Sequence, residues 1–186
     1  MTAEQLEQRA AEVLADIEKF IWNGRKLPVP IKEIAESHFG LLVRDIEDMT
    51  AAPGVPTLGD GQSISGLLLP SKGEIWVNAE EARQWPARRR FTIGHELGHW
   101  CLHREPGQQA LFCRKTAIDE EDQGQTSDDR NIEHEANIFA AAITMPAPMI
   151  REAYDRYRLE SDCHPHMCRL FAASGAAMGR RLHAVI

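Results

Sequence analysis

The sequence has no apolar segment that could cross a membrane. Its 186 residues contain no uninterrupted apolar run of about 18 residues or more, the length that a membrane-spanning helix requires. The opening stretch, MTAEQLEQRAAEVLADIEKF, is acidic and amphipathic, so it lacks the apolar centre of an export signal. We therefore expect a cytoplasmic protein that does not associate with membranes.

The sequence is also poor in cysteine. It contains 4 cysteines, none of them in a Cys-x-x-Cys pair, which argues against a structural zinc knuckle and favours free thiols. Residues 163–168, CHPHMC, hold four potential metal ligands, but their spacing matches no common zinc pattern and includes a proline. A loop that leads into a helix is the preferred interpretation of this stretch.

Positive charge is scarce as well. The formal net charge is -7, which weighs against direct nucleic-acid binding. Two short basic runs, RRR at 88–90 and GRR at 179–181, are the only features that favour such binding. The first run is expected to form the solvated first turn of a helix, although three positive charges are unfavourable at that end of a helix dipole.

The spacing of apolar residues predicts a mainly helical chain with a small sheet. Helices are expected at about 3–22, 31–39, 88–103, 131–144 and 147–158, and as two short helices within 165–184. Strands are expected at 41–46, 65–70 and 74–78, the last two forming a hairpin. Residues 50–63 and the acidic stretch 116–130 are expected to be loops.

Residues 94–99 read GHELGH and contain the pattern His-Glu-x-x-His. On a helix, His95 and His99 project from one face one turn apart, so their imidazoles can bind the same zinc ion. Glu96 can then reach a water at that ion and accept its proton. The alternative is an amphipathic helix with two packed histidines, but buried imidazoles need partners. Gly98, unfavourable within a helix by roughly 1 kcal/mol, would be explained by close approach of another backbone or of a substrate.

A catalytic zinc site needs a third protein ligand, and residues 131–137, NIEHEAN, offer three candidates. Glu133 is preferred because Asn137 lies one turn further on the same face. There Asn137 can accept a hydrogen bond from a ligating histidine and orient its ring. His134 and Glu135 are the alternatives. Two histidines and a carboxylate suit zinc, although manganese or iron can occupy similar sites.

Taken together, these stretches resemble the ImmA/IrrE family of zinc-dependent metallo-endopeptidases. The similarity is carried by EIWVN (74–78), RRRFTIGHELGHWCLH (88–103), EHEANIFAAAITMP (133–146) and FAASGAAMGRRLHAVI (171–186). We accordingly expect an α+β fold: a mainly helical, zincin-like metallopeptidase domain with about three strands packed on the HExxH helix. The expected organisation is a single domain, 1–186, with N-terminal helices and a first strand (1–50), a catalytic core (65–146) and C-terminal helices (147–186).

The resemblance implies that His95, His99 and Glu133 hold the zinc and that Glu96 is the general base. It also implies a protein substrate, typically a helix-turn-helix repressor whose cleavage derepresses stress-response, prophage or mobile-element genes. One alternative is a regulatory binding module that sequesters the repressor without cleaving it, with zinc in a structural role. Another is a direct DNA-binding protein.

Two further features of the site are left open by the sequence. An extended substrate could add to an exposed edge of the EIWVN strand, or that strand could belong to the core, and both can hold at once if one face packs while the edge binds. The residue that stabilises the oxyanion is not distinguished by any pattern. The candidates are His103, His164, His166, Tyr154 and the arginines of the last helices.

Overall fold

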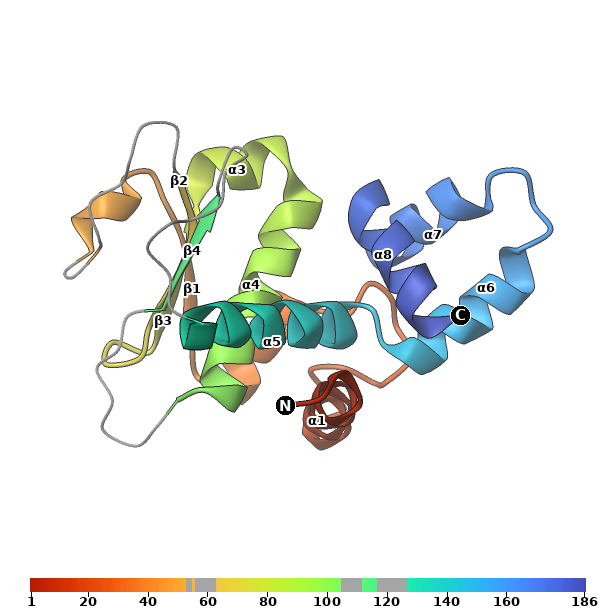
Figure 1. Cartoon of the computed structure of the whole chain (residues 1–186), viewed down its shortest axis with the longest axis horizontal. Helices are drawn as coiled ribbons and strands as arrows, with labels where there is room; N and C mark the ends of the chain where they lie inside the picture. Colours follow the sequence, from red (N-terminus) through yellow and green to blue (C-terminus); the bar gives the residue numbers. More distant parts are fainter. Residues whose placement is uncertain (53–54, 56–62, 105–111, 117–126) are drawn as a thin grey trace.

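Two long helices occupy the centre of the molecule, between a small sheet and the N- and C-terminal helices (Figure 1). The computed structural model describes residues 1–52, 55, 63–104, 112–116 and 127–186, without the side chains of 112–116 and 129. The predicted loops at 50–63 and 116–130 lie mostly outside these residues. The central helices are α4 (Pro86–Leu102) and α5 (Ser127–Thr144). The other helices are α1 (Ala3–Asp16), α2 (Ile31–Glu33), α3 (Ala79–Gln84), α6 (Ala147–Tyr157), α7 (Cys163–Phe171) and α8 (Gly175–Val185).

The sheet has four strands in the order β1-β3-β2-β4. They are β1 (Leu42–Ile46), β2 (Ser63–Leu69), β3 (Glu74–Asn78) and β4 (Phe112–Thr116). The predicted hairpin of β2 and β3 is confirmed, and β1 pairs with β3 in parallel. The mainly helical α+β class is confirmed, with one strand more than the three expected. Sequence reasoning missed β4 because FCRKT lacks the alternation of a half-buried strand.

The strand order corrects one expectation about substrate binding. EIWVN is β3, which is hydrogen-bonded to β1 on one side and to β2 on the other. Its three central residues, Ile75, Trp76 and Val77, are buried. The prediction of an exposed edge at this strand is therefore wrong, and the core alternative holds. The edges of the described sheet are β1 and β4.

The first helix is shorter than its apolar spacing predicts. A capping box between Thr2 and Gln5 begins α1, but Ile17 takes an extended conformation and ends it. Ile17 and Trp22 both turn into the main core, so burial outweighs the continued helical pattern. The second predicted helix begins as α2 and continues as a π-helical turn, η1 (Ile34–His38).

Each arginine of the 88–90 run contacts a different segment of the chain, so the expected solvated turn is not observed. The contacts are Arg88 Nε to the carboxylate of Glu81 in α3 (2.9 Å), Arg89 Nε to Asp45 in β1 (2.8 Å) and an Arg90 amino group to the Val29 carbonyl (2.7 Å). These contacts hold the start of α4 against three neighbouring segments. Their use inside the fold removes one of the two features that favoured DNA binding.

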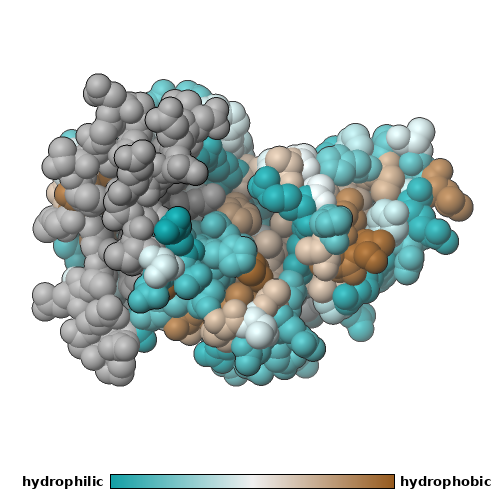
Figure 2. Space-filling view, viewed as in Figure 1, coloured by the Kyte–Doolittle hydropathy of each residue, from teal (hydrophilic) through white to brown (hydrophobic). Residues whose placement is uncertain are grey.

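The C-terminal helices α6, α7 and α8 pack around their own apolar cluster, which includes Met167, Phe171 and Met178. The surface is hollowed between these helices and α4 (Figure 2), at a recess of about 540 Å³. Buried Arg181 of α8 donates from Nε to the Met145 carbonyl (2.8 Å) and pairs with Glu7 of α1. Within the described chain, no helix combines the length and the apolar character needed to cross a membrane.

Candidate metal and catalytic site

The two histidines of the HExxH pattern lie in the middle of α4, on its buried side. Both side chains have no solvent exposure, and their Nε2 atoms are 3.0 Å apart. The helix packs against β2 and β3 of the sheet and against α5. The one-turn spacing therefore places both imidazoles toward a common point inside the molecule.

Glu133 reaches this point from the start of α5. Its Oε2 lies 3.1 Å from His95 Nε2, and its Oε1 lies 3.2 Å from His99 Nε2. Zinc bonds of about 2.0–2.2 Å in a tetrahedral arrangement would separate ligand atoms by roughly 3.3–3.5 Å. The observed separations are close to that requirement. Among the described residues, His95, His99 and Glu133 are the group that could hold a metal ion.

The electrostatics of Glu133 also suit a metal ligand. Burial by itself would raise the pKa of this carboxyl group. Hydrogen bonds and charge attraction from His95 and His99 outweigh burial and bring the pKa well below its usual range. Glu133 is therefore ionised at neutral pH, which is the state that binds a cation.

The close approach of α5 depends on two glycines of α4. A Cβ atom on Gly98 would lie 3.1 Å from the Ala136 Cα, and one on Gly94 would lie 3.1 Å from the Thr144 Cγ2. The expectation that Gly98 allows another backbone to approach is confirmed. A side chain at Gly98 would require α5 to move away from α4 by a few tenths of an ångström, and Glu133 would move with it.

Asn137 lies where the sequence places it, one turn beyond Glu133. Its Oδ1 is 3.1 Å from His95 Nδ1, on the opposite side of the ring from the Nε2 that faces Glu133. The alternative third ligands are not in the group: His134 is exposed, and Glu135 contacts His103 instead, at 3.1 Å. Sequence periodicity alone could not exclude them.

His103 is not placed to stabilise an oxyanion beside the metal. Its Nδ1 lies 3.1 Å from His99 Nδ1, so it is behind the His99 ring relative to the converging Nε2 atoms. Burial lowers the pKa of His103, although Glu135 opposes this effect, so the ring is neutral at neutral pH. The contact with Glu135 was missed by sequence reasoning, and only the one-turn spacing of His99 and His103 hinted at a pair.

Glu96 is buried beneath strand β2, beside a glycine that sequence reasoning also missed. A Cβ atom on Gly66 would lie 2.6 Å from Glu96 Oε1 and 2.4 Å from Thr92 Cγ2. Both distances are far below van der Waals contact. Only glycine therefore fits at this position while Glu96 keeps its place. A glycine within a strand is the signal that could have indicated this close approach.

The cysteine- and histidine-rich stretch at 163–168 is helical throughout and forms the beginning of α7, so the helix begins two residues before the expected position 165 and the expected loop is not observed. Cys168 Sγ and His164 Nδ1 are 3.9 Å apart, and the His166 ring lies 4.0 Å from that of Tyr157. In the described part of the chain, no second group of potential metal ligands is found beside the one at His95. Burial raises the pKa of the Cys101 thiol to about 12, so that thiol stays protonated.

Comparison with known proteins agrees with this geometry. A family model described as the IrrE N-terminal-like domain, Peptidase_M78, matches residues 56–183, which is more than half of the 186-residue chain. The match includes α4 and α5 and therefore all the residues of the candidate site. A search of curated proteins gave no match. From the family match we conclude that the chain belongs to the IrrE N-terminal-like peptidase family, in agreement with its resemblance to ImmA/IrrE proteins.

Proposed function

We propose that this protein is a cytoplasmic, zinc-dependent endopeptidase that cleaves a helix-turn-helix transcriptional repressor. The observation that carries the proposal is the convergence of His95 Nε2, His99 Nε2 and the Glu133 carboxylate at 3.0–3.2 Å. A bound zinc ion would make a water acidic and polarise the scissile carbonyl. Manganese or iron would suit the same donors, and elemental analysis of protein purified without chelators distinguishes the three metals.

In the proposed reaction Glu96 acts as general base and then as general acid. It takes a proton from the attacking water as the water oxygen bonds to the carbonyl carbon of the substrate. It then gives that proton to the leaving amine as the carbon–nitrogen bond breaks. His95, His99 and Glu133 hold the cation, while Asn137 keeps the His95 ring in the required orientation.

The edge strand β4 is the surface on which we place the substrate. Extended peptides bind proteins by adding a strand to a free sheet edge. Strand β4 pairs with β2 on one side and forms an edge of the described sheet, and it also contacts α4. Because Glu96 lies under the neighbouring strand β2, a peptide along β4 would pass near the base.

The preference for a repressor rests on the family to which the chain belongs. We expect that co-expression with a helix-turn-helix repressor encoded beside its gene yields two repressor fragments, detected by mass spectrometry. A stable complex containing intact repressor and metal-loaded protein would instead support sequestration, the second candidate function. If the experiment yields neither fragments nor a complex, both candidate functions are contradicted.

We further propose that residues 1–186 work as one domain. Helix α1 packs along α5, Arg181 joins α8 to α1 and to Met145, which directly follows α5, and Ala141 of α5 packs against the apolar cluster of the C-terminal helices. The N- and C-terminal helices thus contact the helix that carries Glu133.

Gly66→Ala is expected to reduce cleavage about a hundredfold while zinc binding is retained. The added methyl group would displace the Glu96 carboxylate, because β2 is held between two strands and cannot easily move away. Single-turnover cleavage and zinc stoichiometry are the two measurements. Gly179→Ala is the control, since a Cβ there meets only His164, at 3.9 Å. Unchanged cleavage by the Gly66 variant would show that Glu96 does not depend on this close approach.

A further inference from the structure

We propose that His103 and Glu135 are positioning residues that hold the second metal-binding histidine, His99, in its ligating orientation. The inference rests on the proposed function to the extent that His99 binds a metal ion. It gives a role to His103 and Glu135, which lie outside the HExxH pattern and the third-ligand position.

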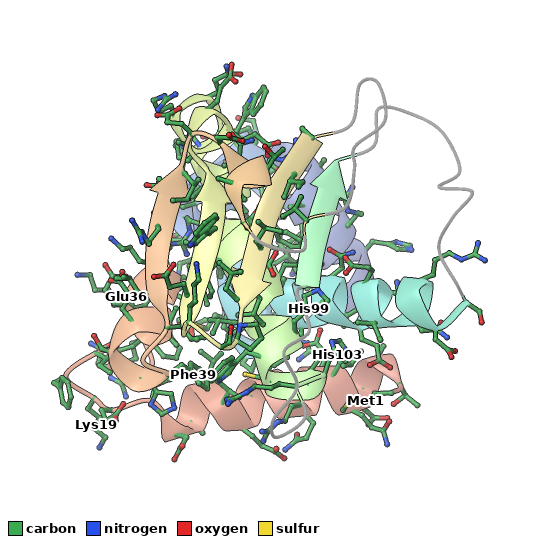
Figure 3. All side chains as sticks on the ribbon, turned by 90° about the vertical axis from the view of Figure 1, so that its left-hand side faces the viewer. Met1, Lys19, Glu36, Phe39, His99 and His103 are labelled. Atoms are coloured by element: carbon green, nitrogen blue, oxygen red, sulfur yellow. The ribbon has the colours of Figure 1, made fainter. Side chains whose placement is uncertain are left out.

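The contacts form a continuous path from the candidate metal position to α1. His99 Nδ1 lies 3.1 Å from His103 Nδ1, and His103 Nε2 lies 3.1 Å from Glu135 Oε2. The other oxygen of Glu135 accepts from the Met1 amino group. Figure 3 shows His99, His103 and Met1 in succession, from the centre of the molecule toward the start of α1.

The metal ion at one end of this path and the Glu135 carboxylate at the other determine which nitrogen donates and which accepts at each contact. If His99 binds a cation through Nε2, its proton must be on Nδ1, which then donates to His103 Nδ1. His103 must consequently carry its own proton on Nε2, and this N–H donates to the Glu135 carboxylate. Each nitrogen has one role, so the carboxylate selects the tautomer of His103, and His103 selects that of His99.

The two histidine ligands are therefore supported in different ways. His95 has a direct partner, Asn137, on the same helix as Glu133. The support of His99 comes from a second imidazole, and a carboxylate fixes that imidazole in turn. The His103 side chain is 8% exposed, so little solvent can replace either contact. Partners of this kind typically change metal affinity by about 10–100-fold when they are removed.

Two substitutions of His103 separate this role from simple packing. Asparagine places an oxygen near the position of Nδ1 and can still accept from His99, whereas glutamine places its amide near Nε2 and retains the contact with Glu135. We expect His103→Asn to keep the zinc dissociation constant within about threefold and His103→Gln to raise it about 10–100-fold. The constant is measured by competition with a chromophoric chelator. His134→Asn, an exposed histidine of α5, is the matched control and should change nothing.

A spectroscopic measurement tests the tautomer directly. Long-range proton–nitrogen spectra of histidine-labelled, zinc-loaded protein should show His99 protonated on Nδ1 in the unaltered chain and in His103→Asn. Equal zinc affinity and equal His99 signals in both His103 variants would overturn the inference and leave the proposed function intact. Failure of the unaltered chain to bind zinc would overturn the proposed function, and the inference with it. Melting temperatures of the metal-free variants identify any general loss of folding.

Discussion

Glu96→Gln is expected to lower the rate of substrate cleavage by about 10²–10⁴-fold, with zinc content and fold retained. Glutamine has nearly the shape of glutamate, so it fills the same buried position beneath Gly66. It cannot accept the proton of the attacking water, and that loss accounts for the effect. The measurement is a single-turnover time course of fragment formation, with zinc determined on the same sample.

The matched control for this variant is Glu152→Gln, which makes the same chemical change at an exposed position on α6. It should cleave at the rate of the unaltered protein. If Glu96→Gln still cuts the proposed repressor substrate at that rate, Glu96 is not the base. The same variant would be useful for isolating the complex with an intact substrate, because binding does not require the proton transfer.

Glu133→Gln is expected to weaken zinc binding by more than about 100-fold. Removing a residue that hydrogen-bonds to a metal ligand typically costs roughly 10–100-fold in affinity, and this change removes a charged ligand itself. In the unaltered protein, zinc at about a thousand times its dissociation constant adds about 4 kcal/mol to the free energy of unfolding. For a domain of this size, that corresponds to a rise in melting temperature of roughly 8–16 °C. The Glu133 variant should lose most of this rise, and a chelator should remove it from the unaltered protein.

Scanning calorimetry with and without zinc measures both effects. His134→Asn tests the competing third ligand, and we expect it to keep the full rise in melting temperature. A zinc-dependent rise that survives in Glu133→Gln but disappears in His134→Asn would reverse the assignment. The prediction depends on geometry, because the Glu133 carboxylate lies 3.1 Å from His95 Nε2 and His134 is exposed on the same helix.

Features of the site that depend on local spacing were predictable from the sequence. The one-turn separation of His95 and His99, and that of Glu133 and Asn137, follows from helix geometry alone. The hairpin of β2 and β3 was predictable for the same reason, since its two strands are adjacent in the chain. The excess of apolar residues on one face of α4 likewise indicated that the histidines point inward, and both are buried.

Features that depend on contacts between distant segments were not predictable. The sequence left open whether β3 is an edge strand, but β1 and β2 enclose it, and β1 and β4 form the edges of the described sheet. Neither the contact of Gly66 with Glu96 nor that of Glu135 with His103 leaves a periodic trace in the sequence. Strand order is decided by pairing between segments whose side-chain patterns are equally compatible with an edge or a centre.

By itself, then, the sequence determined which chemical groups this protein presents on each helix: two imidazoles and a carboxylate on α4, and a second carboxylate with an amide on α5. Only the tertiary structure decided which of them meet. It brought α5 to within contact of Gly98, which selected Glu133 over its neighbours as the group facing both histidines. The physical reason is that helix periodicity sets the direction in which a side chain points, whereas the packing of two helices sets the distance between side chains on the two helices.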